Sequence, residues 1–335
     1  METIYGDIAA RCGGNIYLGV VGPVRTGKST LVKRIMEVLV LPAISDPYRA
    51  ERARDELPQC GSGKTIMTAE PKFVPEEAVE VSPDGTAKIR IRMIDSVGYM
   101  VPGAMGAEEE GSPRMVTTPW FDREIPMTQA AELGTKKVME GHATMGLVVT
   151  TDGSITDIPR QDYVQAERKA ILDMAATGKP FLVVINTRNP QSPQAQELKE
   201  NFNREYGINA LVLDCQGASE EDIRQLFAAM LYSFPMNAME VYLPRWMDAL
   251  EAGHPVKAAL FAGLLELAQS IPSLGQAEAA LPKLGELPQV RGYSLKALRP
   301  ATGTAALAVD FPESLFYEIL SERSGITVES DSQLL

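Results

Sequence analysis

The first 240 residues alternate short apolar runs with segments whose apolar residues recur every three or four positions. Short runs rich in Val and Ile are typical of strands buried on both faces of a parallel sheet. The segments between them have the spacing of amphipathic helices that cover such a sheet. We therefore predict an α/β unit with a mostly parallel sheet and helices on both faces. The expected strands lie at 16–21, 89–94, 146–150, 181–185 and 210–213, and the expected helices at 31–40, 129–140, 161–176, 194–206 and 220–233.

Two long stretches interrupt this alternation, at 41–82 and 99–127. The first is polar, and the second is rich in Gly, Pro and Met and contains Trp120 and Phe121. Loops of this length in a compact domain are usually functional or mobile. We expect both stretches to be irregular loops, and we leave open whether the two aromatic residues face a partner or the core.

A different pattern begins near Val241. Helical spacing at 244–252, 256–268 and 312–322 is combined with strand-like runs at 293–298 and 304–309. The sequence therefore predicts two domains, an α/β domain at 1–240 and a smaller α+β domain at 241–335.

Composition and charge limit the classes of partner. A net charge of −12 argues against a broad nucleic-acid surface, because neutralising phosphates requires clustered Lys and Arg. Cys12, Cys60 and Cys215 are widely spaced and, with two histidines, form no metal-ligand pattern, as in a cytosolic protein with reduced thiols. The N-terminus lacks a leader, and no apolar run approaches the roughly 20 residues of a membrane span. We expect a protein that is neither secreted nor membrane-spanning.

The first expected strand leads directly into a phosphate-binding motif. Gly22 and Gly27 stand five positions apart and are followed by Lys28 and Ser29, with an amphipathic helix directly behind them. Glycines at these positions let a loop fold around a polyphosphate with its N–H groups pointing inward, while Lys28 reaches the β- and γ-phosphates and Ser29 binds Mg²⁺. The motif predicts a nucleoside triphosphate site. Its expected phosphate contacts are Gly22, Arg25, Thr26, Gly27, Lys28, Ser29 and Thr30.

A second motif follows the next strand. Asp95 is separated by two residues from Gly98, the arrangement in which an aspartate holds Mg²⁺ and a glycine N–H meets the γ-phosphate. A threonine that senses the γ-phosphate and Mg²⁺ is expected between the two motifs. Thr68 is the first candidate and Thr65 the second.

Base preference is expected to depend on residues 186–189. Guanine-specific relatives have Asn-Lys-x-Asp here, and this chain has Asn186, Thr187, Arg188 and Asn189. An amide accepts one of the two hydrogen bonds that a carboxylate accepts from guanine, and no lysine lies beneath the base. We therefore expect adenine, with Asn186 among the nucleotide contacts.

Hydrolysis is expected to be slow, because Tyr99 follows Gly98 where many GTPases have a glutamine that orients water. Arg25, Lys64 and Arg114 are candidate charge donors, and the favoured interpretation of each is a solvated surface cation.

The motifs together resemble the stage IV sporulation protein A family of endospore-forming bacteria. The resemblance covers about 1–245 and rests on residues 19–30, 55–59, 63–75, 97–104, 113–115, 118–120 and 150–155. It implies a P-loop ATPase related to the translation-factor class of GTPases, with ATP and Mg²⁺ as ligands and Lys28, Thr68 and Asp95 as catalytic residues. Ser29, Thr68 and Asp95 would be the metal ligands.

The resemblance also implies a biological role. Members of this family use ATP hydrolysis to polymerise into the basement layer of the spore coat, in the mother-cell cytoplasm at the outer surface of the forespore. Implied partners are further copies of the chain, other spore coat proteins and a small membrane-bound protein with an amphipathic helix.

Two departures from the family pattern affect these expectations. Ala69 replaces the second of two sensor threonines, which bears on the rate or coupling of hydrolysis. The family also has a C-terminal domain used for assembly and membrane docking, which indicates a piece of a longer protein or an incomplete gene. The alternatives are a regulatory GTPase of the translation-factor class and, less favoured, a small-molecule kinase.

Overall fold

The computed structural model divides the chain into two compact units, Met1–Ser233 and Phe234–Leu335, which are described separately. The boundary predicted at residue 240 falls inside strand β11 (Ala238–Tyr242), whereas the units divide before it. β11 is part of unit 2 because it pairs with β13 (Thr304–Asp310). The structure describes residues 4–58, 70–82, 88–106, 108–109, 112–119 and 121–334.

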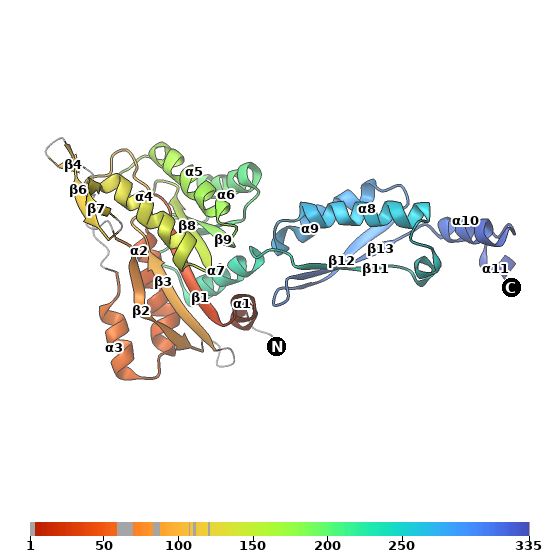
Figure 1. The fold of residues 1–335 in the computed structure, drawn as a ribbon, viewed down its shortest axis with the longest axis horizontal. Coiled ribbons are helices and arrows are strands. Elements are labelled where there is room, and N and C mark those ends of the chain that lie inside the picture. The colour runs from red at the N-terminus through yellow and green to blue at the C-terminus, as the bar shows by residue number, and fades with distance from the viewer. Residues whose placement is uncertain are drawn as a thin grey trace. The chain divides into compact units, whose positions relative to one another are not determined.

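Unit 1 has a six-stranded sheet with the order β10-β9-β8-β1-β3-β2 (Figure 1). Its neighbouring strands run parallel, except that β2 at the edge is antiparallel to β3. The prediction of a mixed α/β fold with a mostly parallel sheet is confirmed. The strands are β1 (Asn15–Val21), β2 (Lys72–Val81), β3 (Ile89–Asp95), β8 (Met145–Thr151), β9 (Phe181–Asn186) and β10 (Ala210–Leu213).

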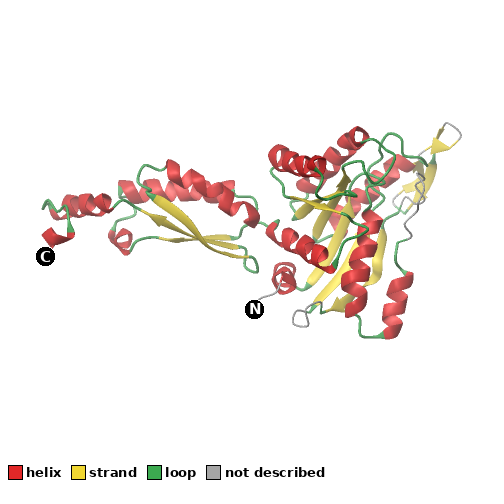
Figure 2. Ribbon diagram, turned by 180° about the vertical axis from the view of Figure 1, so that it is seen from behind, coloured by secondary structure: helices red, strands yellow, loops and turns green. Residues whose placement is uncertain are grey.

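Helices cover both faces of this sheet, as Figure 2 shows from behind. Side chains alternate along a strand, so Val21 of β1 joins the core beneath α4, α5 and α6, whereas Leu18 is buried on the opposite face. On that opposite face α1 contacts α7, and α7 contacts the π-helical turn that continues α2. The helices are α1 (Ile4–Cys12), α2 (Lys28–Ile35) with its turn at Met36–Val40, α3 (Pro47–Asp55), α4 (Met127–Lys137), α5 (Arg160–Ala176), α6 (Pro193–Tyr206) and α7 (Glu220–Tyr232).

The two stretches expected to be irregular contain regular elements, so those expectations were wrong. Residues 41–82 include α3, which begins at an Asp46 cap and buries only Ala53, and the edge strand β2, whose pairing is interrupted by a bulge between Val74 and Val79. The single buried residue of α3 and the bulge in β2 leave neither element with a clear apolar period. Within 99–127 the described residues include two antiparallel strand pairs (Figure 1), β4 (Glu108–Glu109) with β5 (Ser112–Pro113), and β6 (Met115–Thr118) with β7 (Phe121–Pro126), which we call the β6–β7 hairpin.

Unit 2 is a three-stranded sheet with helices on one face. β13 lies in the centre, parallel to β11 and antiparallel to β12 (Gly292–Arg299). Leu260 and Leu264 of α8 (Pro255–Ser270) share a core with Leu307 of β13. The remaining helices are α9 (Ala277–Ala280), α10 (Glu313–Ser324) and α11 (Asp331–Leu334), with short 3-10 turns at Arg245–Ala249, Leu274–Gln276 and Leu281–Glu286. Among the described residues, no helix is both long enough and apolar enough to cross a bilayer.

Candidate nucleotide-binding site

The residues of both phosphate motifs meet at the carboxyl ends of the parallel strands of unit 1, where open α/β sheets bind ligands. In the β1–β3 register Val20 is opposite Asp95, so the loop after β1 and the residues after β3 begin at the same level. That loop leads directly into α2, as Figure 1 shows.

The loop from Gly22 to Gly27 adopts backbone conformations that few side chains permit. Gly27 has φ +90° at the N-cap of α2, and a Cβ there would lie 2.1 Å from Asn186 Nδ2. Arg25 is the only non-glycine residue with positive φ among those described, at 65°. Backbone strain of this kind is concentrated at functional sites. Thr26 donates to Pro23 O at 2.9 Å and closes the loop.

Lys28 lies inside this loop. Its side chain is buried, and Nζ donates to Pro23 O at 2.6 Å and to Gly22 O at 3.4 Å. Burial lowers the pKa of Lys28 to about 8, with a partial offset from the negative charge of Asp95. A buried cation held by carbonyl oxygens is suited to binding an anion, which would relieve its desolvation penalty.

Asp95 and Ser29 form the second part of the site. Ser29 Oγ donates to Asp95 Oδ2 at 2.5 Å, and the carboxylate is 8% exposed. Burial raises the pKa of Asp95, whereas the Ser29 hydrogen bond and the Lys28 charge lower it. Asp95 Oδ1 is buried and has no hydrogen-bond partner within the described parts of the chain.

This donor set fits a magnesium ion. An unsatisfied buried carboxylate oxygen beside a hydroxyl offers the oxygen ligands that Mg²⁺ prefers, and Mg²⁺ usually takes its other ligands from phosphate and water. Over the residues that the structure describes, no three His, Cys, Asp or Glu side chains group as metal ligands. Ser29 and Asp95 therefore offer oxygen ligands to such an ion.

Gly98 lies against Lys28, and its amide has a partner that the sequence did not indicate. A Cβ on Gly98 would lie 2.1 Å from Gly22 O and 2.6 Å from Lys28 Nζ, so this close approach requires glycine. The Gly98 N–H donates to Thr135 Oγ1 of α4 at 3.2 Å, and Thr135 donates onward to Ala131 O. Thr135 is fully buried and 37 residues away in sequence, so no local pattern marks it.

Tyr99 provides no group to orient water at this site. Its hydroxyl donates to Asp173 Oδ2 of α5 at 2.6 Å, and its ring is buried. Burial, followed by the Asp173 carboxylate, raises the pKa of Tyr99, so the phenol stays protonated. Its backbone completes the loop by donating to Gly22 O and accepting from Val24 N.

Asn186 bridges two loops with both ends of its amide. Nδ2 donates to Thr26 O at 3.0 Å, and Oδ1 accepts from Cys215 N at 3.1 Å. The side chain is buried, so Asn186 holds the phosphate loop against the ends of β9 and β10. Asn186 therefore lies at the site and stabilises the position of the loop.

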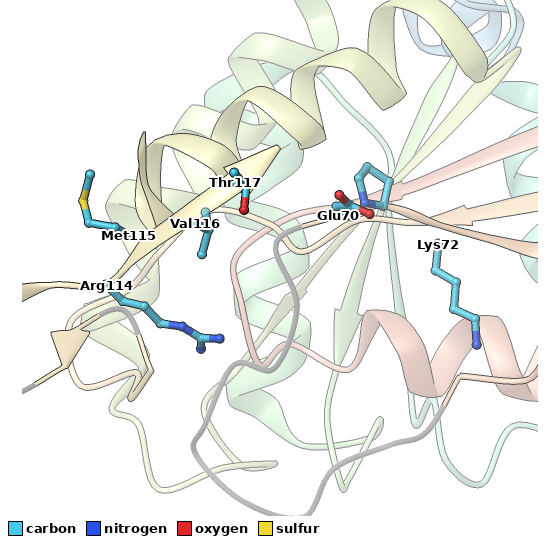
Figure 3. Close-up of a pocket in the computed structure, with 7 residues that line it drawn as sticks. Glu70, Lys72, Arg114, Met115, Val116 and Thr117 are labelled. Carbon is cyan, nitrogen blue, oxygen red and sulfur yellow. The ribbon is translucent and has the colours of Figure 1, made fainter. Parts of the chain in front are cut away.

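The other candidates lie in different places. Thr30 lies in the first turn of α2. Arg114 lines a cavity of about 610 Å³ together with Glu70, Lys72, Met115 and Thr117, and Figure 3 shows Arg114 and Thr117 on one side of it and Glu70 and Lys72 on the other. Thr68, Thr65, Lys64 and Ala69 lie outside the described residues, as does Trp120.

Comparison with known proteins identifies the family. Residues 1–235 match the family model of the ATPase domain of stage IV sporulation protein A, and residues 236–335 match that of its middle domain. Stage IV sporulation protein A of Clostridioides difficile is 41% identical over 334 residues, which is 100% of this chain and 68% of the relative. The proteins of the same name from Bacillus anthracis and Bacillus subtilis are each 40% identical over 332 residues, covering 99% of this chain and 68% of their own length.

A crystal structure from Thermus thermophilus is similar over 57% of this chain and 22% of its own, with 14% identity. Its TM-score of 0.32 is too low to add to the description of the fold.

The family model that matches residues 1–235 is that of an ATPase domain, and the alternative of a regulatory GTPase finds no support among the relatives. The chain therefore belongs to the stage IV sporulation protein A family, whose members are structural sporulation proteins with an ATPase domain.

Proposed function

We propose that this chain binds Mg·ATP at the loop from Gly22 to Gly27 and hydrolyses it slowly, with turnover coupled to polymerisation. The observation that carries the proposal is a buried Lys28 cation near a buried Asp95 carboxylate that accepts from Ser29, inside a domain of an ATPase family. Lys28 would bind the β- and γ-phosphates, and the loop amides and the N-terminus of α2 would bind the remaining phosphate oxygens.

Ser29 and Asp95 would hold the magnesium ion, with Thr68 as the expected third protein ligand. A bound Mg²⁺ supplies charge neutralisation on the phosphates. The phosphate and nucleoside contacts remain those of the sequence motifs, which are Gly22, Arg25, Thr26, Gly27, Lys28, Ser29, Thr30, Gly98 and Asn186. The P-loop class most similar to this arrangement is that of the translation-factor GTPases, and we propose that this chain has changed from GTP to ATP.

Slow turnover is supported by Tyr99, which follows Gly98 at the position where a carboxamide would orient water. Its hydroxyl donates to Asp173 instead. Another residue must then orient the attacking water, and a second copy of the chain is one source of such a residue. The rate per molecule would rise as copies assemble.

The product of this reaction would be a scaffold rather than a released molecule. We propose that ATP turnover drives self-assembly into the basement layer of the spore coat, in the mother-cell cytoplasm at the forespore surface. Other spore coat proteins, and for full-length relatives a small membrane-bound protein with an amphipathic helix, would be its further partners. The net charge of −12 argues against nucleic acid.

Polymerisation and phosphate release test the proposal together. With ATP and Mg²⁺, light scattering and electron microscopy should show polymers, and phosphate release per molecule should climb with protein concentration for ATP but not for GTP. Lys28→Ala should abolish both signals. Lys33→Ala is the matched control, because Lys33 lies later on the same helix, is 42% exposed and forms a surface ion pair with Glu37. Polymers that persist in Lys28→Ala would refute the proposal.

A further inference from the structure

The loops after β8 and β9 lie beside the phosphate loop, where the proposed function requires the nucleoside. Thr151 and Asn186 are the last register pair of these two parallel strands. Asn186 holds Thr26 O, and the side chain of Ile155 would lie 3.9 Å from a Cβ on Gly27. Residues 152–155 and 187–189 therefore flank the same side of the site.

The Asp152 carboxylate joins these two loops by accepting from two hydroxyl groups. Thr187 Oγ1 donates to Oδ2 at 2.6 Å, and Ser154 Oγ donates to Oδ1 at 2.6 Å. The Ser154 N–H adds a third hydrogen bond to Oδ1 at 2.9 Å. We call the three residues Asp152, Ser154 and Thr187 the Asp152 clamp.

Both hydroxyls of the clamp also bind the backbone of the segment 187–189. Ser154 Oγ accepts from Arg188 N at 3.0 Å, and Thr187 Oγ1 accepts from Asn189 N at 3.1 Å. A hydroxyl has one proton, and because each gives its proton to Asp152, its lone pairs are free to accept an amide. The carboxylate thus fixes the direction of both chains of hydrogen bonds.

Thr187 is committed to this arrangement. Its side chain is fully buried, at the position where a guanine-reading loop has a lysine whose stem packs beneath the base. A short side chain that donates to Asp152 provides no such stem. The position of the segment 187–189 is therefore set by the protein before any base is bound, and preorganisation of this kind reduces the cost of binding.

We infer that Asp152 is a positioning residue for the nucleobase, which holds the segment 187–189 in place through Ser154 and Thr187. The inference rests on the proposed function, because it requires the nucleoside to lie against this segment. Asp152 is not among the proposed phosphate or metal contacts, so it acts on the base and leaves phosphate binding alone.

Calorimetry with ATP and with inorganic triphosphate, both with Mg²⁺, separates these roles. Asp152→Asn is nearly isosteric but replaces an acceptor oxygen by a donor, so one of the two hydroxyls loses the carboxylate oxygen that accepts its proton. Thr187→Val removes one hydroxyl at constant shape, and Thr187→Ser restores it. We expect Asp152→Asn and Thr187→Val to weaken ATP binding about tenfold and to leave inorganic triphosphate within about twofold of wild type, while Thr187→Ser retains ATP affinity.

Asp214→Asn is the matched control. Asp214 stands at the end of the neighbouring strand β10, and its Oδ1 accepts from Gln216 N at 3.0 Å, which an amide oxygen can also do. It should bind both probes like wild type. The inference is overturned if Asp152→Asn and Thr187→Val bind ATP like wild type, or if both lose ATP and inorganic triphosphate equally, because the clamp would then support only the fold. Failure of the wild-type chain to bind ATP at all would overturn the proposed function itself, and the inference with it.

Discussion

At the residue scale, the site depends on two buried ionisable groups, Lys28 and Asp95, and burial disfavours the charged form of each. Desolvation is the largest effect on both, lowering the pKa of Lys28 and raising that of Asp95. Each charge partly compensates the other, and a phosphate with a bound cation would compensate both. The sequence motif identifies these residues, but only the folded chain shows that Lys28 is held by the carbonyls of Gly22 and Pro23.

The buried lysine should make stability depend on pH. Its pKa is about 8 in the folded chain, against an ordinary value of 10.5. Between these values the unfolded chain binds more protons, so the free energy of unfolding should rise with pH as the burial penalty of the cation disappears. Relative to Lys28→Met, wild type should gain about 2 kcal/mol between pH 7 and pH 10. Denaturant unfolding of both proteins across this range measures the difference.

Groups shared by the two proteins cancel in that comparison, and Lys33→Met controls for loss of a charge at an exposed position of α2. A difference between wild type and Lys28→Met that stays constant with pH would show that the lysine is not desolvated in the folded chain.

At the scale of elements, the apolar pattern predicted the buried strands of the main sheet, whereas α1, α3, β2 and β11 were not predicted. β1, β3, β8, β9 and β10 were all found from their Val and Ile runs, within two residues at their ends. β2 was missed because an edge strand exposes residues such as Glu76 and is broken by a bulge, and α3 because only Ala53 is buried. Contacts across the fold, such as that of Thr135 with Gly98, have no signal in a single sequence.

Helix α4 should affect nucleotide binding through Thr135. The Gly98 N–H is expected to bind the γ-phosphate, and in this structure it donates to Thr135 Oγ1 instead. Thr135→Val removes this competing acceptor, so the ratio of ATP affinity to ADP affinity should rise a few fold. The same change leaves the Gly98 amide without a protein partner and should lower the free energy of unfolding by about 1 kcal/mol. Titration calorimetry with both nucleotides, and denaturant unfolding, give the two values.

Thr135→Ser keeps the hydroxyl that accepts from Gly98 and loses only the methyl group, so it should retain the wild-type ratio of ATP affinity to ADP affinity. If Thr135→Val bound ATP and ADP in the wild-type ratio, the Gly98 amide would not be shared between α4 and the nucleotide.

At the scale of the whole molecule, assembly requires surfaces that the fold of one chain leaves exposed. The β6–β7 hairpin carries Met115 and Phe121, with 47% and 37% of their surfaces exposed. In the sequence this hairpin comes after the site residue Gly98. Met127, the first residue of α4, donates its N–H to Arg114 O beside this hairpin. The hairpin is thus connected to α4, whose Thr135 accepts from the Gly98 N–H. This connection suits an assembly surface that responds to nucleotide binding.

Replacing both exposed side chains should therefore separate assembly from nucleotide binding. We expect Met115→Ser with Phe121→Ser to reduce ATP-dependent light scattering severalfold while ATP affinity stays within about twofold of wild type, because neither side chain is among the phosphate or nucleoside contacts. Buried apolar surface contributes about 25 cal/mol per Å², so losing two such side chains from a repeated contact weakens it at every step of a polymer. Leu172→Ser controls for loss of an apolar residue that is 52% exposed but belongs to α5 rather than to the hairpin. Undiminished scattering by the double variant would exclude the hairpin as an assembly surface, and a parallel loss of ATP binding would mean that it acts on the nucleotide site instead.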